Sequence, residues 1–493
     1  MVFFSVVIAM HWHSLIRILP FVFEFEALEM NPTTEKQFLP LPPMVKGGWP
    51  IGSARYFAED PLALFERSSA KYGDIYRLDS VFFHIMPQFD HFIIVANPDA
   101  VKHIMQDNNR NYVKSFAYQI LSNLVGNGLL TSEGDFWRKQ RRLMQPGFHR
   151  DKLANFGTIM TNACNEMLAE WRQLEDGAMV NVSKDMMALT LKIVCRAMFS
   201  TDVGRAIEVV SREFDVANEL INDRIVNPQT LPLWVPTPRN KREKQAYAAI
   251  QEVVINIIEE RRKGAETHDD LLSMLMETED ADTGERMTDK QVQDEVITMF
   301  LAGHETTAVA LSWMFIALDE NPEVEQKAIH EARTVLNGRV PTLADMRNLT
   351  YTRMVVDETL RLYPPAWLIG RHSLKDDEAA GFRIPAKSNC MIPVYAIHRD
   401  PRYWENPEQF MPERFNPESN EKRHKFVYFP FGGGPRLCIG NNFALMEMQL
   451  LIPMILQEFK LSKIAGQEIK KEPLLTMRQS PHLKMTLTKR ASL

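Results

Sequence analysis

The sequence predicts a mainly α-helical protein with a small β region. Residues 151–264 carry apolar side chains at the spacing of amphipathic helices, interrupted by a proline-rich connector at 227–240. A second helical stretch of roughly 30 residues runs from Thr288 to Asn321. Short runs rich in Ile, Val, Phe and Tyr, at 74–78 and 92–96, are typical of strands. No repeat or Gly/Ser-rich linker divides these segments, so we expect one large unit.

The composition excludes several classes of protein. The 493 residues are 45% apolar and 24% charged, which is ordinary for a globular chain with a large core. The formal net charge of −6 argues against nucleic acid as a general partner. The four cysteines, Cys164, Cys195, Cys390 and Cys438, form no C-x-x-C pair. So few cysteines in so long a chain favour a reducing compartment such as the cytoplasm.

Residues 1–40 are interpreted as a leader and a proline-rich entry segment, and residues 41–493 as a single domain. The apolar run from Val2 to Met10 is followed by His11 and His13, and it is shorter than the roughly 20 residues of a membrane span. No basic stretch precedes it, which argues against a signal peptide. We favour a leader outside the fold, with Met30 as an alternative start. The remaining alternative is peripheral membrane association through residues 1–23.

The first part of the domain mixes helix and strand. Residues 61–72 are expected to form a helix, and the strands at 74–78 and 92–96 flank a less regular segment. Gly126 and Gly128 are followed by Thr131 where a dinucleotide-binding fingerprint needs a third glycine. We therefore interpret this segment as a loop that precedes the next helix.

The helix that begins near Thr131 has acidic residues early and basic residues later. Trp137 and Arg141 are four residues apart, so they lie on one face and one carboxylate could accept hydrogen bonds from both. A solvated helix with favourable dipole interactions is the alternative. Three further cations lie on other faces of this helix: Arg138, Lys139 and Arg142.

The long helix carries polar residues at its middle, in the run Ala302-Gly-His-Glu-Thr-Thr307. Glycine inside a helix costs about 1 kcal/mol relative to alanine, and polar groups among core residues need a reason. A helix–helix crossing or a solvent-facing notch is one explanation, and a functional site is the other. Ala302 and Thr306 lie one turn apart on the same face.

The segment from Phe431 to Gly440 has three consecutive glycines and a proline, so it forms a loop that ends in Cys438. A helix follows at once. A thiol at a helix N-terminus meets free N–H groups that favour the thiolate, and Arg436 adds a positive charge nearby. The sequence therefore indicates thiolate chemistry or metal ligation, the alternative being a tight turn with an incidental cysteine.

The pattern of Phe431, Gly434, Arg436, Cys438 and Gly440 resembles the haem-binding signature of the cytochrome P450 family. Four other motifs of that family occur in the same order, and the resemblance runs from about Leu41 to the end of the chain. It implies the cytochrome P450 fold, with haem b between the long central helix and the helix after the cysteine. It also implies that Cys438 is the axial thiolate, which favours O–O cleavage.

The resemblance assigns further residues around the haem. Ala302 is expected to face the iron, and Gly303 to leave room for dioxygen. Thr306 would hydrogen-bond the activated dioxygen, and Glu305 would connect it to solvent as a proton source. His304 is not expected to be a second ligand, because two helical residues turn by about 200°. Expected propionate partners are Arg436, Trp137, Arg141 and Arg371, and the expected structural support of the cysteine loop is Glu358, Arg361 and Arg414.

By this resemblance the protein is a haem-thiolate monooxygenase. It would insert one oxygen atom of O2 into a fatty acid, terpenoid, steroid or similar apolar molecule by hydroxylation or epoxidation. The motif at 302–307 is similar to that of bacterial fatty-acid hydroxylases. Alternatives are a peroxide-driven or isomerising relative, a haem sensor or electron carrier without turnover, and a helical scaffold that has lost the haem. The expected pocket lining is 116–124, Met299, Ala302, Thr306, 366–369 and 477–481.

The resemblance also implies partners. A monomer is expected that receives electrons from a separate reductase with a ferredoxin or flavodoxin, because no flavin or nicotinamide module follows the cysteine helix. An acidic donor would dock on two basic clusters, formed by Arg138, Lys139, Arg142, Lys422, Arg423 and Lys425.

Overall fold

The computed structural model describes residues 39–48, 52–79, 91–148, 150–201, 206–227, 230–264, 268, 270–279 and 284–491. The proposed anchor at 1–23 and nearly all of the predicted leader lie outside these residues. Pro40–Leu493 forms one compact unit, and everything below concerns that unit.

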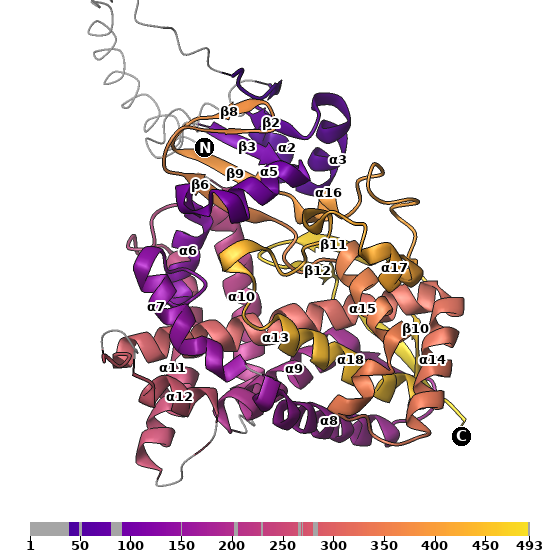
Figure 1. Cartoon of the computed structure of the whole chain (residues 1–493). Coiled ribbons are helices and arrows are strands. Elements are labelled where there is room, and N and C mark those ends of the chain that lie inside the picture. The colour runs from indigo at the N-terminus through magenta and orange to yellow at the C-terminus, as the bar shows by residue number, and fades with distance from the viewer. Residues whose placement is uncertain are drawn as a thin grey trace, which may run out of the picture. The chain divides into compact units, whose positions relative to one another are not determined.

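Helices make up most of the described chain, as predicted, and Figure 1 shows them gathered around α13. The α-helices are α2 (Ala54–Glu59), α3 (Pro61–Tyr72), α5 (Pro98–Lys102), α6 (Phe116–Val125), α7 (Gly134–Met144), α8 (Arg150–Arg172), α9 (Val182–Phe199), α10 (Ala206–Val226), α11 (Pro238–Lys263), α12 (Leu271–Glu277), α13 (Asp289–Glu320), α14 (Pro322–Leu336), α15 (Thr350–Leu362), α16 (Val394–Ile397), α17 (Pro417–Asn420) and α18 (Asn441–Glu458).

The strands form a small β region beside the helices. The largest sheet has the order β1-β2-β3-β9-β6-β4, with antiparallel neighbours except for the parallel pairs β1–β2 and β3–β9. The strands are β1 (Met44–Val45), β2 (Ile75–Leu78), β3 (His91–Val95), β4 (Tyr112–Lys114), β5 (Ala178–Asn181), β6 (Ile369–Ser373), β7 (Asp377–Ala379), β8 (Phe382–Ile384), β9 (Ser388–Ile392), β10 (Phe459–Lys463), β11 (Lys470–Pro473), β12 (Met477–Ser480) and β13 (Lys484–Lys489).

Helix α13 is the core element, as its length and apolar composition predicted. Its N-terminus carries a capping box, in which the Thr288 side chain accepts from the Gln291 N–H and the Gln291 side chain accepts from the Thr288 N–H. Most side chains from Val292 to Leu318 are buried. Among the described helices it alone is long and apolar enough to cross a membrane, but its burial identifies it as a core helix.

Two elements on either side of a cavity carry the predicted motifs. Helix α13 carries the run 302–307, and the loop that ends at Gly440 leads into α18. Helix α9 packs closely along α13. Figure 1 shows the loop before α18 above the middle of α13, with the large sheet at the top of the view. The two motifs, at 302–307 and 431–440, therefore face one space although they are far apart in the sequence.

Candidate active site

A cavity of about 1470 Å³ lies between α13 and the loop before α18. Ala302 and Thr306 line it from the helix, and Cys438 lines it from the loop. Most of its other lining side chains are apolar, including Phe116, Trp367 and Leu368. The space is thus a deep apolar pocket with one thiol in it.

The cysteine loop is held in a tight turn. The Cys438 N–H donates to the Phe431 carbonyl oxygen at 3.0 Å. Gly434 has a φ of +64°, and a Cβ there would lie 2.0 Å from the Met105 carbonyl oxygen, so only glycine fits. A Cβ at Gly440 would meet no other atom within 4 Å; because Gly440 lines the cavity, that Cβ would enter it. The loop is thus closely packed against Met105 at Gly434 and open toward the cavity at Gly440.

Cys438 is exposed to the cavity, whereas Cys164, Cys195 and Cys390 are buried. Surrounding protein raises the pKa of the Cys438 thiol, while the Gly440 N–H and the charge of Arg141 act in the opposite direction. The expected preference for thiolate from the helix N-terminus is therefore outweighed by desolvation in the protein alone. A metal ion bound at the sulfur would favour the thiolate against this desolvation.

Cations gather on the cavity wall beside the cysteine loop. Lys114, Arg371 and Arg436 all line the cavity. Burial, followed by repulsion from Arg436 and also from Arg371, lowers the pKa of Lys114 to about 6 despite the nearby carboxylate of Glu133. Burial likewise lowers the pKa of Arg436 to about 10. Positive groups that repel one another around a cavity favour an anionic ligand, and the propionates of a haem meet that requirement.

The predicted propionate partners Arg436, Trp137, Arg141 and Arg371 all line the cavity. The Arg436 guanidinium lies over the Trp137 ring, with its carbon 3.7 Å from the ring centroid. Arg436 also donates to the Ser132 carbonyl oxygen at 3.0 Å and pairs with Glu133. Trp137 therefore contacts Arg436, and the expected binding of one propionate by Trp137 and Arg141 together stays a prediction.

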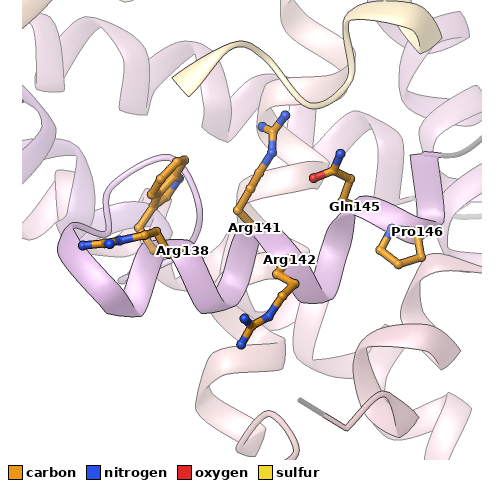
Figure 2. Close-up of a pocket in the computed structure, with 6 residues that line it drawn as sticks. Arg138, Arg141, Arg142, Gln145 and Pro146 are labelled. Atoms are coloured by element: carbon orange, nitrogen blue, oxygen red, sulfur yellow. The ribbon is translucent and has the colours of Figure 1, made fainter. Parts of the chain in front are cut away.

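Arg141 instead turns toward the cysteine loop. Its Nη1 donates to the carbonyl oxygen of Leu437 at 2.8 Å, next to Cys438. Figure 2 shows Arg141 pointing to one side of α7, while Arg138 and Arg142 point away from it. The positive charge that acts on the thiol is thus that of Arg141, and not that of Arg436 as the sequence suggested.

The middle of α13 opens to the cavity at one turn. Ala302 is exposed and Thr306 is half-buried, although most of the helix is buried. The Thr306 hydroxyl donates to the Ala302 carbonyl oxygen at 2.9 Å. Thr298, Glu305 and Thr307 of α13 also line the cavity, so Thr306 is the most exposed of several polar side chains on this wall.

Gly303 has a structural explanation that differs from the expected one. A Cβ at this position would lie 2.9 Å from Cγ2 of Val194 on α9. Beside it, the Thr190 hydroxyl donates to the His304 carbonyl oxygen at 2.9 Å. The glycine thus permits the close crossing of two helices. Gly303 also lines the cavity, and the expectation that it leaves room for dioxygen stays a prediction.

Glu305 is buried and held by three side chains. Its Oε1 accepts from Arg478 Nε at 2.8 Å, from the Thr476 hydroxyl at 2.8 Å and from Asn218 Nδ2 at 2.9 Å. Arg478 also pairs with Asp215 of α10 at 2.6 Å. The carboxylate lines the cavity, but it is tied to an ion pair rather than directed to solvent as the sequence analysis expected.

His304 lies away from the cavity, as its position on the helix predicted. Its Nδ1 is 2.7 Å from the Phe300 carbonyl oxygen, and its ring contacts Phe214 at a centroid distance of 5.5 Å. Burial lowers the pKa of this imidazole, so it is a neutral core residue.

Glu358, Arg361 and Arg414 form the predicted buried network. Arg361 donates to both carboxylate oxygens of Glu358, at 2.7 and 2.8 Å, and Arg414 Nε donates to the same carboxylate at 3.3 Å. The remaining Arg361 N–H groups hold the carbonyl oxygens of His398, Pro407 and Gln409. The network thus fastens α15 to the segment before the cysteine loop.

The pocket lining differs from the expectation at its C-terminal end. Residues 473–476 line the cavity, whereas Met477 is in the core and donates its N–H to Pro365. The expected contributions of α6, Met299 and residues 366–369 are present.

Four residues with a part in the site were not foreseen: Lys114, Glu133, Glu295 and Arg478. Each acts through a partner that is distant in the sequence, such as Glu133 with Arg436. For Glu295 the sequence did hold a signal that could have been used, because an acid on the buried face of a helix such as α13 is unusual. The other three carried no local signal.

A helical fold around an apolar cavity, with one cysteine facing it and cations beside it, defines a haem protein with a thiolate ligand. Residues 42–487 match the family described as Cytochrome P450. The chain is 34% identical over 443 residues to "Cyclooctatin synthase" of Streptomyces melanosporofaciens, covering 88% of this chain and 93% of that protein. It is 33% identical to "Cyclooctat-9-en-7-ol 5-monooxygenase" of the same organism, covering 76% and 81%.

A solved structure gives the same result. The crystal structure of the cytochrome P450DA heme domain aligns with a TM-score of 0.82 and 26% identity, over 92% of this chain and 99% of that one. The chain belongs to the cytochrome P450 family. It is a monooxygenase whose cofactor is a haem with a cysteine thiolate ligand, and it uses O2, a hydrophobic substrate and a redox partner.

Proposed function

We propose that Cys438 is the axial ligand of haem b and that the protein oxidises uncharged, apolar, ring-containing substrates. The bound haem supplies reductive activation of O2. The observation that carries the proposal is the position of Cys438: of the four cysteines, all in the described part of the chain, it alone lines the apolar cavity. Lys114, Arg371 and Arg436, the basic residues on the cavity wall beside the cysteine loop, support haem binding next to Cys438.

The chain's own residues would handle protons at the cavity face of α13. Thr306 carries the most exposed hydroxyl on that face, and its Oγ1 can accept a hydrogen bond while it donates to Ala302. Glu305 would supply a proton to this hydroxyl only after it leaves Arg478. Glu305 and Thr306 are thus proposed as the catalytic residues. The ion pair between Glu305 and Arg478 restrains the Glu305 carboxylate.

The charges of the cavity favour a neutral substrate over a fatty acid. Away from the cysteine loop, the cations among the described lining residues are Arg55 and Arg224. Arg55 pairs with Glu59 at 2.7 Å, and Arg224 pairs with the buried Glu243 at 2.6 Å. A substrate carboxylate would therefore have to compete with an existing carboxylate for either cation.

The names of the relatives point the same way. One of them acts on cyclooctat-9-en-7-ol, a ring-containing alkenol by its name. We infer that a terpenoid or a similar cyclic molecule is a better candidate than a steroid acid or a fatty acid. Hydroxylation and epoxidation both remain compatible with this cavity.

An acidic ferredoxin or flavodoxin is proposed as the electron donor. A surface pocket of about 410 Å³ is lined by Trp137, Arg138, Arg141, Arg142, Gln145 and Pro146 (Figure 2). Arg138, Arg142, Lys422 and Lys425 are exposed, whereas Lys139 and Arg423 are half-buried. The docking cluster is therefore proposed to be Arg138, Arg142, Lys422 and Lys425. Replacing Arg138 and Arg142 with glutamine should weaken donor binding and reduce its dependence on salt.

We propose a cytoplasmic monomer, and the lack of a disulfide among its four cysteines, all of which lie in described segments, supports a reducing compartment. Peripheral association through residues 1–23 and the division into a leader (1–40) and a catalytic domain (41–493) also remain proposals.

The test is an optical titration of the purified ferric protein. A shift from low to high spin with a cyclic terpene alcohol, and a weaker one with palmitic acid than with hexadecanol, is the expected result. Cys438→Ser should abolish the red-shifted Soret band of the reduced carbon monoxide complex, and Cys164→Ala is the matched control because it removes a buried core thiol. Retention of that band in Cys438→Ser would overturn the ligand assignment, and stronger binding of the acid would overturn the substrate class.

A further inference from the structure

The connector between α6 and α7, residues 126–131, is clasped to α13 by two consecutive carboxylates. Asp294 Oδ2 accepts from the Asn127 N–H at 3.0 Å, and Glu295 Oε2 accepts from the Leu129 N–H at 2.9 Å. Glu295 is fully buried, and Lys290 neutralises Asp294 at 2.6 Å. The two acids thus act as acceptors for a loop that has no regular structure of its own.

The clasp leaves no room for a side chain at either glycine of this connector. Gly126 has a φ of +69°, and a Cβ there would lie 2.0 Å from Asp294 Oδ1. A Cβ at Gly128 would lie 2.3 Å from the Thr298 hydroxyl. Gly126 and Gly128, which lack the third glycine of a nucleotide-binding motif, are therefore needed for the close contact of this connector with α13.

The peptide groups of Leu129 are held at both polar atoms. Glu295 accepts from its N–H, and Nζ of Lys114 donates to its carbonyl oxygen at 3.0 Å. Lys114 also donates to the Ser132 carbonyl oxygen at 3.0 Å. Leu129 and the next residue, Leu130, both line the cavity. A stretch of cavity wall is thus fixed between α13 and β4.

Glu295 stands two helical turns before Ala302. Thr298 and Met299 lie between them and also line the cavity. Glu295 accepts a hydrogen bond from the Leu129 N–H. This bond therefore sets the distance between the wall segment, Leu129 and Leu130, and the cavity face of α13.

An acid at this buried position carries a desolvation cost. Glu295 Oε1 has no hydrogen-bond partner, and the described groups that face the carboxyl are the Leu129 N–H, Asp294 and Lys114. Burial raises the pKa of Glu295 to about 7. An apolar side chain would avoid that desolvation, but it would leave the Leu129 N–H without an acceptor.

We propose that Glu295 is a positioning residue that determines substrate selectivity by fixing Leu129 and Leu130 in the cavity wall. This inference rests on the proposed function, because it takes the cavity to be the substrate pocket. Glu295 contacts no substrate itself. The hydrogen bond that Glu295 accepts from Leu129 determines the width of the substrate pocket at this point.

The experiment compares Glu295→Leu with Glu295→Gln in the haem-loaded protein. The leucine variant removes the acceptor, and the glutamine variant keeps a carbonyl oxygen for the Leu129 N–H. Glu320→Leu is the control, because Glu320 is an acid on the same helix whose pair with Lys463 is half-exposed. The first readout is hydrogen exchange of a peptide that spans 126–131. The second is the ratio of dissociation constants, from the Soret shift, for a slender and a bulky apolar ligand.

Loss of one buried hydrogen bond should speed connector exchange in Glu295→Leu by about 5- to 100-fold and change the affinity ratio by a similar or smaller factor. Glu295→Gln and Glu320→Leu should stay close to the unsubstituted protein. The proposal is overturned if Glu295→Leu lowers the melting temperature alone, leaving exchange and affinity ratio unchanged, or if the glutamine variant behaves like leucine. If no apolar ligand shifts the Soret band of the unsubstituted protein, the proposed function fails, while the exchange data still decide the clasp.

Discussion

Arg478 Nε donates to Glu305 Oε1 at 2.8 Å, and both side chains are buried. The two residues are 173 positions apart in the sequence. Asp215 of α10 binds the other end of the same guanidinium at 2.6 Å. One arginine of β12 thus ties α10 to α13, beside the turn of α13 that carries Thr306. Any movement of α10 away from the cavity must therefore break the part-buried Arg478–Asp215 ion pair or carry Arg478 along.

Arg478→Met should destabilise the protein by about 3–5 kcal/mol, because it leaves two carboxylates without their cation. The measurement is the free energy of unfolding in urea. Arg286→Met is the control, because its pair with Glu279 is more than half exposed and should contribute at most about 1 kcal/mol. Equal losses in the two variants would show that the Glu305 pair does not stabilise the fold.

Arg361→Lys should lower stability by about 3 kcal/mol and release haem more readily. Lysine keeps the charge but loses the planar fork that reaches Glu358 and three backbone carbonyl oxygens. Arg353→Lys on the same helix is the matched control, since Arg353 is part-exposed and holds only Asp357. Haem retention and urea unfolding are measured together. A loss no larger than that of the control would contradict the proposed support of the cysteine loop.

Gly303→Ala should destabilise the protein by about 1–2 kcal/mol, because its Cβ would press on Val194 and outweigh the better helix propensity of alanine. Val194→Ala by itself should cost about 1–3 kcal/mol through the cavity that it leaves. The double variant should lose less than the sum, since each change relieves the other. Additive losses in thermal unfolding would mean that the two positions do not share one space.

His398 should make the protein lose stability as the pH falls. Its Nε2 accepts the Phe429 N–H at 3.0 Å, and burial with the charges of Arg361 and Arg399 lowers the imidazole pKa to about 3. The unfolded chain binds a proton below about pH 6.5 and the folded chain does not, so stability is full above that pH and declines toward pH 3. The loss between pH 7 and 5 should be roughly 2 kcal/mol.

The measurement for His398 is the free energy of unfolding at pH 7, 6 and 5. His398→Gln keeps an acceptor for Phe429 without an imidazole, so its profile should be flatter by that amount. His330→Gln, an exposed substitution on α14, serves as the control. A parallel decline in His398→Gln would assign the acid sensitivity to other groups.

The candidate site shows how far spacing along the chain can predict side-chain contacts. The pair Glu358–Arg361 was predictable because the two residues lie one helical turn apart. Trp137 and Arg141 were placed on one face by the same argument, yet Trp137 pairs with Arg436, which arrives from the cysteine loop. Helical spacing places a side chain on a face. It does not say which residue of another element meets that face.

What the sequence by itself determined were the helical fold, the long central helix with its Thr288 cap, and a glycine-rich loop that presents Cys438 before a helix. These follow from local spacing, capping and turn chemistry, which act over a few residues. Only the tertiary structure decided that Arg478 holds Glu305, that Gly303 faces Val194, and that Glu295 clasps Leu129. Those contacts join residues more than 100 positions apart, and packing of whole elements, rather than any local pattern, brings them together.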